Sequence, residues 1–84
     1  MKFNEKIFLC KDCGFDTMPT RGNEYYAVTD KIWRKVKGGK GMLCIGCLEL
    51  RLGRTLIAID FKVAPINMGV FPYSTRLWAR LHAT

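Results

Sequence analysis

The sequence lacks any long hydrophobic run. No stretch approaches the roughly 18 to 20 consecutive apolar residues that a helix needs to cross a bilayer. The start of the chain leads into a short apolar stretch at residues 7–10, which is too brief for the core of a signal peptide. These absences argue against a membrane protein and against a secreted one, so we expect a cytoplasmic protein.

Histidine is nearly absent, since His82 is the only one in 84 residues. The sequence shows no cluster of histidine and carboxylate, and no nucleophile at a recognisable spacing from a base. The glycine-rich run at residues 38–41 lacks the spacing of a phosphate-binding P-loop and a following Ser or Thr. We therefore expect no catalytic residues, no small-molecule substrate and no enzymatic activity, and we expect His82 at the surface.

Acidic residues are scarce in the second part of the chain. Residues 31–84 carry ten basic and two acidic groups, whereas residues 1–30 carry four basic and five acidic groups. An excess of cations of this kind favours a nucleic-acid partner, whose phosphates it would contact, although a solvated surface that keeps a small protein soluble gives the same pattern. The candidate nucleic-acid-binding residues are Lys31, Arg34, Lys35, Lys37, Lys40, Arg51, Arg54, Arg76 and Arg80.

Cysteine, in contrast, is present in a spaced pattern of two CxxC pairs, Cys10 with Cys13 and Cys44 with Cys47. Zn²⁺ takes four tetrahedral ligands, and a CxxC pair can place two sulfurs on one ion. A redox-active pair is the alternative, but it would leave the other two cysteines without a role. A catalytic zinc keeps an open position, whereas four cysteines close the shell. The pattern predicts one structural Zn²⁺, which would also stabilise a chain too short for a large core.

The chain around the first pair predicts β structure. A strand over residues 6–10 would deliver Cys10, and Gly14 suits the tight turn that follows the pair. The β-prone run at residues 24–29 predicts a second strand after a loop. Together these segments indicate a β-hairpin beside the first cysteine pair.

Three short helices are expected from capping residues and apolar spacing. Asp30 would cap the first, which Gly38 and Gly39 would end; residues 48–52 would form the second, ended by Gly53; and Ser74 would cap the third, at residues 75–82. Residues 54–73 predict either a strand or an irregular apolar segment, interrupted by prolines. The expected core residues are Trp33, Val36, Leu48, Leu52, Leu77 and Trp78.

The order of these elements indicates a fold class. A CxxC knuckle on a strand, a β-hairpin, and a second CxxC whose last cysteine, Cys47, opens a helix form the arrangement of a treble clef. We therefore expect a single α+β domain over residues 1–84, stapled by zinc, with a treble-clef-like finger and short extra helices. A zinc ribbon is the nearest alternative, but the helix-forming residues 48–52 argue against its second hairpin.

The sequence resembles a group of small bacteriophage-encoded four-cysteine zinc proteins of treble-clef type. The resemblance is carried by Cys10-x-x-Cys13-Gly14-x-Asp16-Thr17, Glu24-Tyr-Tyr26, Val28-Thr-Asp30, Trp33, Leu43-Cys44-x-x-Cys47-Leu-Glu49 and Arg51-Leu-Gly-Arg54-x-Leu56. It implies a phage or prophage origin, and hence the cytoplasm of a host cell, but no activity. More distantly, Leu43 to Cys47 is similar to the zinc finger of TraR/DksA-type regulators, whose long coiled coil this chain lacks.

Two kinds of partner remain open from the sequence. The first is nucleic acid, contacted through the basic residues. The second is a host protein, bound through the apolar, proline-punctuated stretch at residues 61–73.

Overall fold

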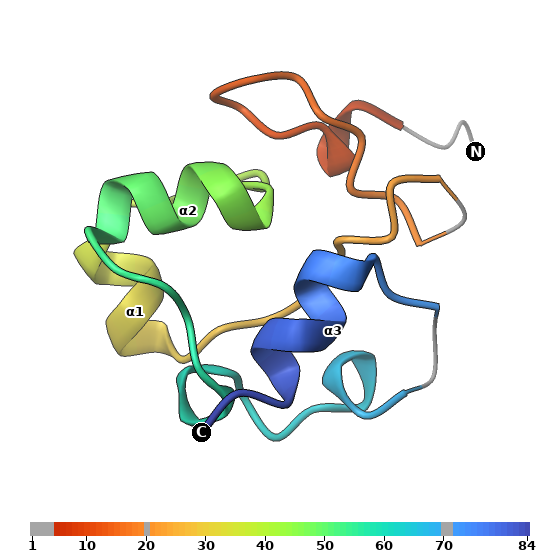
Figure 1. Cartoon of the computed structure of the whole chain (residues 1–84). Coiled ribbons are helices and arrows are strands. Elements are labelled where there is room, and N and C mark those ends of the chain that lie inside the picture. Colours follow the sequence, from red (N-terminus) through yellow and green to blue (C-terminus); the bar gives the residue numbers. More distant parts are fainter. Residues whose placement is uncertain (1–4, 20, 70–71) are drawn as a thin grey trace.

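Helices and turns dominate the computed structural model, which describes residues 5–19, 21–69 and 72–84. The three α-helices are α1 (Asp30–Lys35), α2 (Ile45–Leu52) and α3 (Thr75–Leu81), and the three 3₁₀ helices are η1 (Glu5–Phe8), η2 (Ala58–Asp60) and η3 (Pro65–Asn67) (Figure 1). Across these described ranges, no helix combines the length and the apolar character needed to cross a membrane.

The β component is smaller than the sequence predicts. In the described part of the chain it consists of three isolated bridges, which join Leu9 to Asp16, Cys10 to Met42 and Val28 to Phe61. The predicted strand at residues 6–10 is wrong, because Glu5–Phe8 forms η1 instead. The predicted strand at residues 24–29 is also wrong, and with it the hairpin, because this segment finds other hydrogen-bond partners.

One of those partners is a side chain. Asn67 accepts a hydrogen bond from the backbone N–H of Ala27 and donates one to its carbonyl, at 3.1 and 2.7 Å. The backbone of Lys62 donates to the same carbonyl at 3.0 Å. Buried backbone groups must be paired, and here a side chain and a turn pair them without a neighbouring strand.

The N-cap of helix α1 lies one residue earlier than expected. Thr29, not Asp30, is the N-cap, and its hydroxyl accepts a hydrogen bond from the N–H of Ile32. The helix ends before the two glycines, since Val36 is the C-cap and Lys37 adopts a left-handed conformation at φ 55°. The left-handed residue at the end of the helix is therefore Lys37, one position before the glycine stop expected from sequence.

Gly38 takes part in the helix end, since its N–H donates to the Trp33 carbonyl at 2.9 Å, and it has a second role in packing. A Cβ at this position would lie 2.0 Å from the indole of Trp33, so only glycine allows the ring and the backbone to approach so closely. The Trp33 indole N–H donates to the carbonyl of Gly39 at 2.8 Å. Trp33 thus holds the loop that follows α1.

The other two helices begin and end near their predicted positions. Helix α2 has Cys44 as its N-cap and Gly53 as its left-handed C-cap, at φ 84°. It starts at Ile45 and not at Leu48, which places Cys47 in the first turn, as expected. Ser74 caps α3 by accepting a hydrogen bond from the N–H of Leu77, which confirms that prediction.

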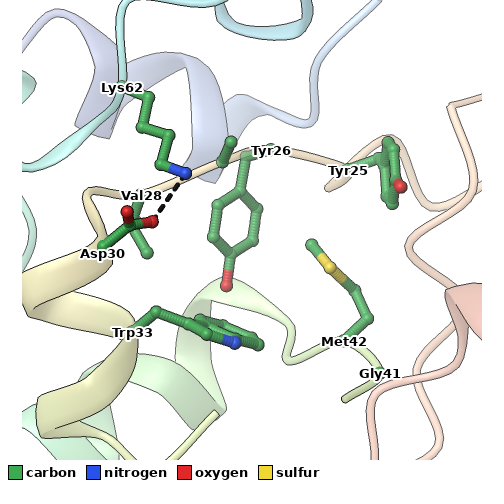
Figure 2. A pocket seen from close by; sticks show the side chains of 9 residues that line it. Tyr25, Tyr26, Val28, Asp30, Trp33, Gly41, Met42 and Lys62 are labelled. Carbon is green, nitrogen blue, oxygen red and sulfur yellow. Dashed lines mark ion pairs between the residues drawn. The ribbon is translucent and has the colours of Figure 1, made fainter. Parts of the chain in front are cut away.

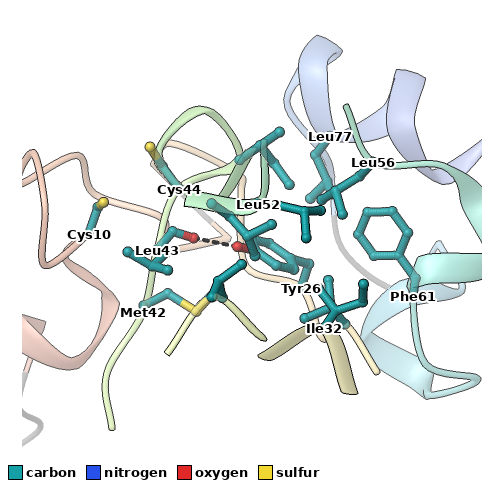
Figure 3. Packing of buried hydrophobic residues seen from close by; sticks show 14 residues of the cluster. Cys10, Tyr26, Ile32, Met42, Leu43, Cys44, Leu52, Leu56, Phe61 and Leu77 are labelled. Carbon is teal, nitrogen blue, oxygen red and sulfur yellow. Dashed lines mark hydrogen bonds between the residues drawn. The ribbon is translucent and has the colours of Figure 1, made fainter. Parts of the chain in front are cut away.

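The core lies between the three helices and the segments that connect them (Figure 3). Its largest fully buried apolar side chains are Leu43, Ile45, Leu48, Leu56 and Leu77. Burial of Val36, Leu48, Leu52 and Leu77 confirms four of the six expected core residues.

The two tryptophans differ from that expectation. Trp33 is partly buried against the core, whereas Trp78 is 55% exposed, so its assignment to the core is wrong. Helix α3 is short and directs Leu77 inward, which leaves the adjacent position, about 100° around the helix, at the surface. There Trp78 stacks on the imidazole of His82, with ring centroids 4.1 Å apart.

In its described residues, 54–69 and 72–73, the segment between α2 and α3 adopts the irregular alternative and not the strand; positions 70–71 of the prediction lie outside the described residues. Leu56 and Phe61 are buried, whereas Ile59 and Val63 are 81% and 95% exposed. The η2 and η3 turns break any regular alternation between buried and exposed positions. The apolar content of this segment is therefore divided between the core and the surface.

Candidate metal centre

The structure brings the four cysteines together. The Sγ atoms of Cys10, Cys13, Cys44 and Cys47 all lie within 4.8 Å of one another, so the four thiols could hold one metal ion. The sulfurs of Cys13 and Cys44 are 3.7 Å apart, far beyond the roughly 2.0 Å of a disulfide. Zn–S bonds of about 2.3 Å in a tetrahedron place the sulfurs about 3.8 Å apart. The donor set and its spacing therefore fit a tetrahedral four-thiolate site.

The first two ligands come from a tight knuckle. The Gly14 N–H donates to the Cys10 carbonyl at 2.8 Å, and the Cys10 N–H donates to the Phe15 carbonyl at 2.8 Å. Gly14 adopts φ 81°, a left-handed conformation that glycine adopts without strain, which confirms its predicted place in the turn. The turn brings Cys10 and Cys13 to the same side of the knuckle.

The other two ligands begin helix α2. Cys44 is the N-cap and Cys47 lies in the first turn, where free backbone N–H groups and the helix dipole favour negative charge. The two half-sites are joined directly by the backbone, because the Lys11 N–H donates to the Met42 carbonyl at 2.9 Å. Cys13 and Cys44 are 31 positions apart in sequence, yet their sulfurs lie 3.7 Å from each other.

The thiols differ in how readily they carry charge. Burial raises the pKa of Cys10, but backbone hydrogen bonds from Cys44, Cys13 and Asp12 outweigh it and lower the pKa to about 7. Burial raises the pKa of Cys44, and burial together with the neighbouring thiols raises that of Cys47. Cys44 and Cys47 therefore resist becoming thiolates without a nearby cation, which is the charge that a divalent metal supplies.

Beside each cysteine pair, an arginine binds a carboxylate. In the first pair, the guanidinium of Arg51 binds both carboxylate oxygens of Asp12, at 2.6 and 2.8 Å. The same guanidinium donates to the carbonyls of Val36 and Lys37, at 3.0 and 3.2 Å. Arg51 therefore connects the first knuckle, the end of α1 and helix α2.

The arginine beside the second pair is Arg76. Its guanidinium binds both carboxylate oxygens of Glu24, at 2.8 and 2.9 Å, and a Cβ on Gly46 would lie 2.8 Å from its Nη1. Glu24 is only 2% exposed and also accepts hydrogen bonds from the Ile45 N–H and the Ser74 hydroxyl. Burial raises the pKa of Glu24, but Arg76 and these donors outweigh it, so the pKa lies below its usual value. One buried carboxylate thus ties the start of α2 to the start of α3.

The sequence-predicted basic residues fall into two sets. We call Arg51, Arg54, Arg76 and Arg80 the paired arginines, because each forms an ion pair, with Asp12, Asp60, Glu24 and Glu49 respectively.

The basic segment, residues 31–40, is different. Among the described residues, none of its five cations forms an ion pair with a carboxylate, and all five are exposed. Asp30, immediately before them, pairs instead with Lys62 at 2.7 Å. The five cations are Lys31, Arg34, Lys35, Lys37 and Lys40.

Sequence reasoning missed the residues that support the metal centre. Glu24 and Arg76 are 52 positions apart, and Asp12 and Arg51 are 39 apart, so no local pattern joins them. One signal was present, since the acidic residues are few and those at positions 12, 24, 49 and 60 lie next to cysteines or in apolar surroundings. Carboxylates in such places usually have a cationic partner.

Comparison of the chain with protein-family models, with curated proteins and with solved structures gives no match.

Proposed function

We propose that this chain is a non-enzymatic zinc protein that binds nucleic acid through its basic segment. One structural Zn²⁺ on the four cysteines would hold a treble-clef-like finger, in which a knuckle supplies two ligands and the start of a helix supplies the other two. The observation that supports the nucleic-acid function is a set of five exposed cations that form no ion pair with a carboxylate in the described chain.

A structural role for the metal follows from the donor set. Four thiolates fill a tetrahedral shell and leave no open position for a substrate or for an activated water. Soft thiolate ligands in a tetrahedral arrangement are typical of Zn²⁺. Four thiolates and one Zn²⁺ together carry a charge of about −2.

The basic segment is suited to phosphate contacts by its position. Ile32 and Val36 point into the core, so Lys31, Arg34 and Lys35 lie on the outer side of α1. Trp33 fixes the loop that carries the remaining two cations. The paired arginines are left out of the proposed interface, because their guanidiniums already bind carboxylates and backbone.

The experiment is a salt titration of binding to single-stranded and duplex oligonucleotides. The variant Lys31→Gln/Arg34→Gln/Lys35→Gln should weaken binding and flatten its salt dependence, by about 0.9 in slope per lost contact for duplex or about 0.7 for single strands. Zinc content and circular dichroism should stay unchanged, since the three side chains lie outside the core.

A matched control separates location from net charge. The variant Ile59→Glu/Val63→Glu/Met68→Glu lowers the net charge by the same three units, at exposed positions outside the basic segment. It should retain the salt slope of the unmodified chain. If the unmodified chain shows no binding at about 50 mM salt, or if both variants lose affinity equally, the basic segment is not a nucleic-acid interface.

A second candidate function is docking on a host protein. It is favoured by an open groove of about 600 Å³, lined by Met68, Pro72, Tyr73, Trp78 and His82 among others. Trp78 is exposed there, and tryptophan is over-represented among residues that dominate protein interfaces. Recovery of one host protein from nuclease-treated lysate, abolished by Trp78→Ala, would favour this candidate over nucleic acid.

A further inference from the structure

A pocket lies directly beside the basic segment. It has a volume of about 240 Å³, below the roughly 300 to 1,000 Å³ of pockets that take drug-sized ligands. Its walls are aromatic and apolar side chains, and an ion pair stands at one side (Figure 2). The size suits one planar ring system.

The walls come from three separate segments. Tyr26 is buried and donates its hydroxyl hydrogen to the Leu43 carbonyl at 2.6 Å, so its ring is held in place. Trp33 is held by its bond to the Gly39 carbonyl and by its contact with Gly38. Met42 borders the pocket from the strand-like segment that leads into α2 (Figure 2). These walls are therefore formed without a ligand.

Two charged side chains line the pocket together with its apolar walls. Asp30 and Lys62 both line the pocket and form an ion pair at 2.7 Å (Figure 2). The carboxylate accepts hydrogen bonds and the ammonium donates them, which matches the mixed donors and acceptors on a nucleobase edge. An apolar slot with such a pair differs from a purely hydrophobic groove.

Two residues that line the pocket have cations of the basic segment as neighbours in sequence. Trp33 lies on α1 between Lys31 and Arg34, and Gly41, which lines the pocket, follows Lys40. Single-stranded nucleic acids are bound by this combination, in which cations follow the phosphates and aromatic side chains stack on unpaired bases. Bases in a duplex are already paired and stacked, and they cannot enter such a pocket without being extruded.

We infer that this pocket receives one unpaired base of a single strand whose phosphates lie on the basic segment. This inference rests on the proposed function and deepens it, because it selects single strands over duplex. It also gives the aromatic side chains a role that phosphate contacts alone would not need.

The test uses the zinc-loaded full chain carrying Trp78→Phe, so that Trp33 is the only tryptophan. Its fluorescence is followed while a 12-nucleotide thymidine strand, an abasic strand of equal length and a duplex are added in turn. The thymidine strand should quench Trp33 and bind at least about five-fold more tightly than the abasic strand. The abasic strand and the duplex should leave Trp33 fluorescence nearly unchanged.

A pair of variants tests the pocket itself. Ala27→Leu enlarges a side chain that lines the pocket, and Ala79→Leu makes the same change on the exposed face of α3. The first should abolish the advantage of thymidine over the abasic strand, with circular dichroism and zinc content retained, and the second should preserve it. If Ala27→Leu does not fold, the comparison of thymidine with abasic strand in the parent protein decides.

The outcomes separate the two proposals. Equal affinity for thymidine and abasic strands, with an intact salt slope, would overturn the base pocket and leave the phosphate-binding function standing. Absence of binding to all three oligonucleotides would overturn both. Quenching by thymidine mononucleotide at the same concentrations as by the strand would also overturn the inference, because the basic segment would then contribute nothing.

Discussion

The basic segment and the paired arginines are both positively charged, but they differ in whether they form ion pairs within the chain. Each paired arginine binds a carboxylate, and Arg51 and Arg76 also reach the two cysteine pairs. The five cations of the basic segment bind no carboxylate of the described chain. The first set is therefore engaged within the chain, whereas the second set forms no ion pair there. A count of basic residues in the sequence does not make this distinction.

The largest effect is expected from removing the metal, which would disrupt both regions at once. Cys44→Ser removes one of four ligands and should leave the chain largely unfolded, because structural zinc supplies about 10 to 16 kcal/mol, comparable to or above the stability of a domain. A chelator should act similarly on the unmodified chain, followed by circular dichroism. Leu50→Ser, at an exposed position of the same helix, should remain folded.

A related prediction concerns the number of zinc ions per chain. Native mass spectrometry should find one zinc ion per chain in the unmodified protein, bound by the four cysteines. Two ions, none, or a pair of disulfides in protein purified under reducing conditions would contradict it.

The next largest effect is the loss of stability when Trp33, which fixes the loop of the basic segment, is truncated. Trp33→Ala should lower the free energy of unfolding by about 3 kcal/mol, the lower end of the range for tryptophan truncation, because the ring is only partly buried. Trp78→Ala should cost below about 1 kcal/mol, since that ring is exposed. Denaturant titration of both variants tests the order, and equal losses would show that their environments are misassigned.

A smaller loss is expected when a paired arginine is removed. Arg76→Met leaves Glu24 buried without its cation, a change that costs about 3 to 5 kcal/mol for a fully buried pair. Because the Arg76 side chain is 40% exposed, we expect about 2 kcal/mol from denaturant titration. Lys35→Met, which removes an exposed unpaired cation, should stay within about 0.5 kcal/mol of the unmodified chain. If the two variants are equally stable, the distinction between the two sets fails.

The smallest expected effect is a change in the salt dependence of nucleic-acid binding. Lys35→Gln should flatten the salt slope of nucleic-acid binding by about 0.7 to 0.9. Arg51→Gln should leave that slope unchanged while lowering the melting temperature, because its guanidinium binds Asp12 and the end of α1. An equal change of slope in both variants would place the paired arginines in the interface as well.

Much of the metal centre could be predicted because its determinants are local. Each CxxC pair needs one tight turn, and Gly14, Ser74 and Gly53 act where local rules expect them. The strands at residues 6–10 and 24–29 could not be predicted correctly, because a strand requires a partner in register, which is a non-local condition. Asn67 and the turn near Lys62 supply the hydrogen bonds that a partner strand would have made.

The sequence by itself determined the four candidate cysteine ligands, the apolar faces of α1 and α2, and the uneven charge of the chain, since these follow from residue type and short spacing. Only the tertiary structure decided which cations are paired, that Trp78 faces solvent, and that Tyr26, Trp33 and Met42 border one pocket. The physical reason is the distance along the sequence over which each interaction acts. Caps, turns and CxxC knuckles act within a few residues, whereas the contact of Glu24 with Arg76 joins positions that only the packed chain brings together.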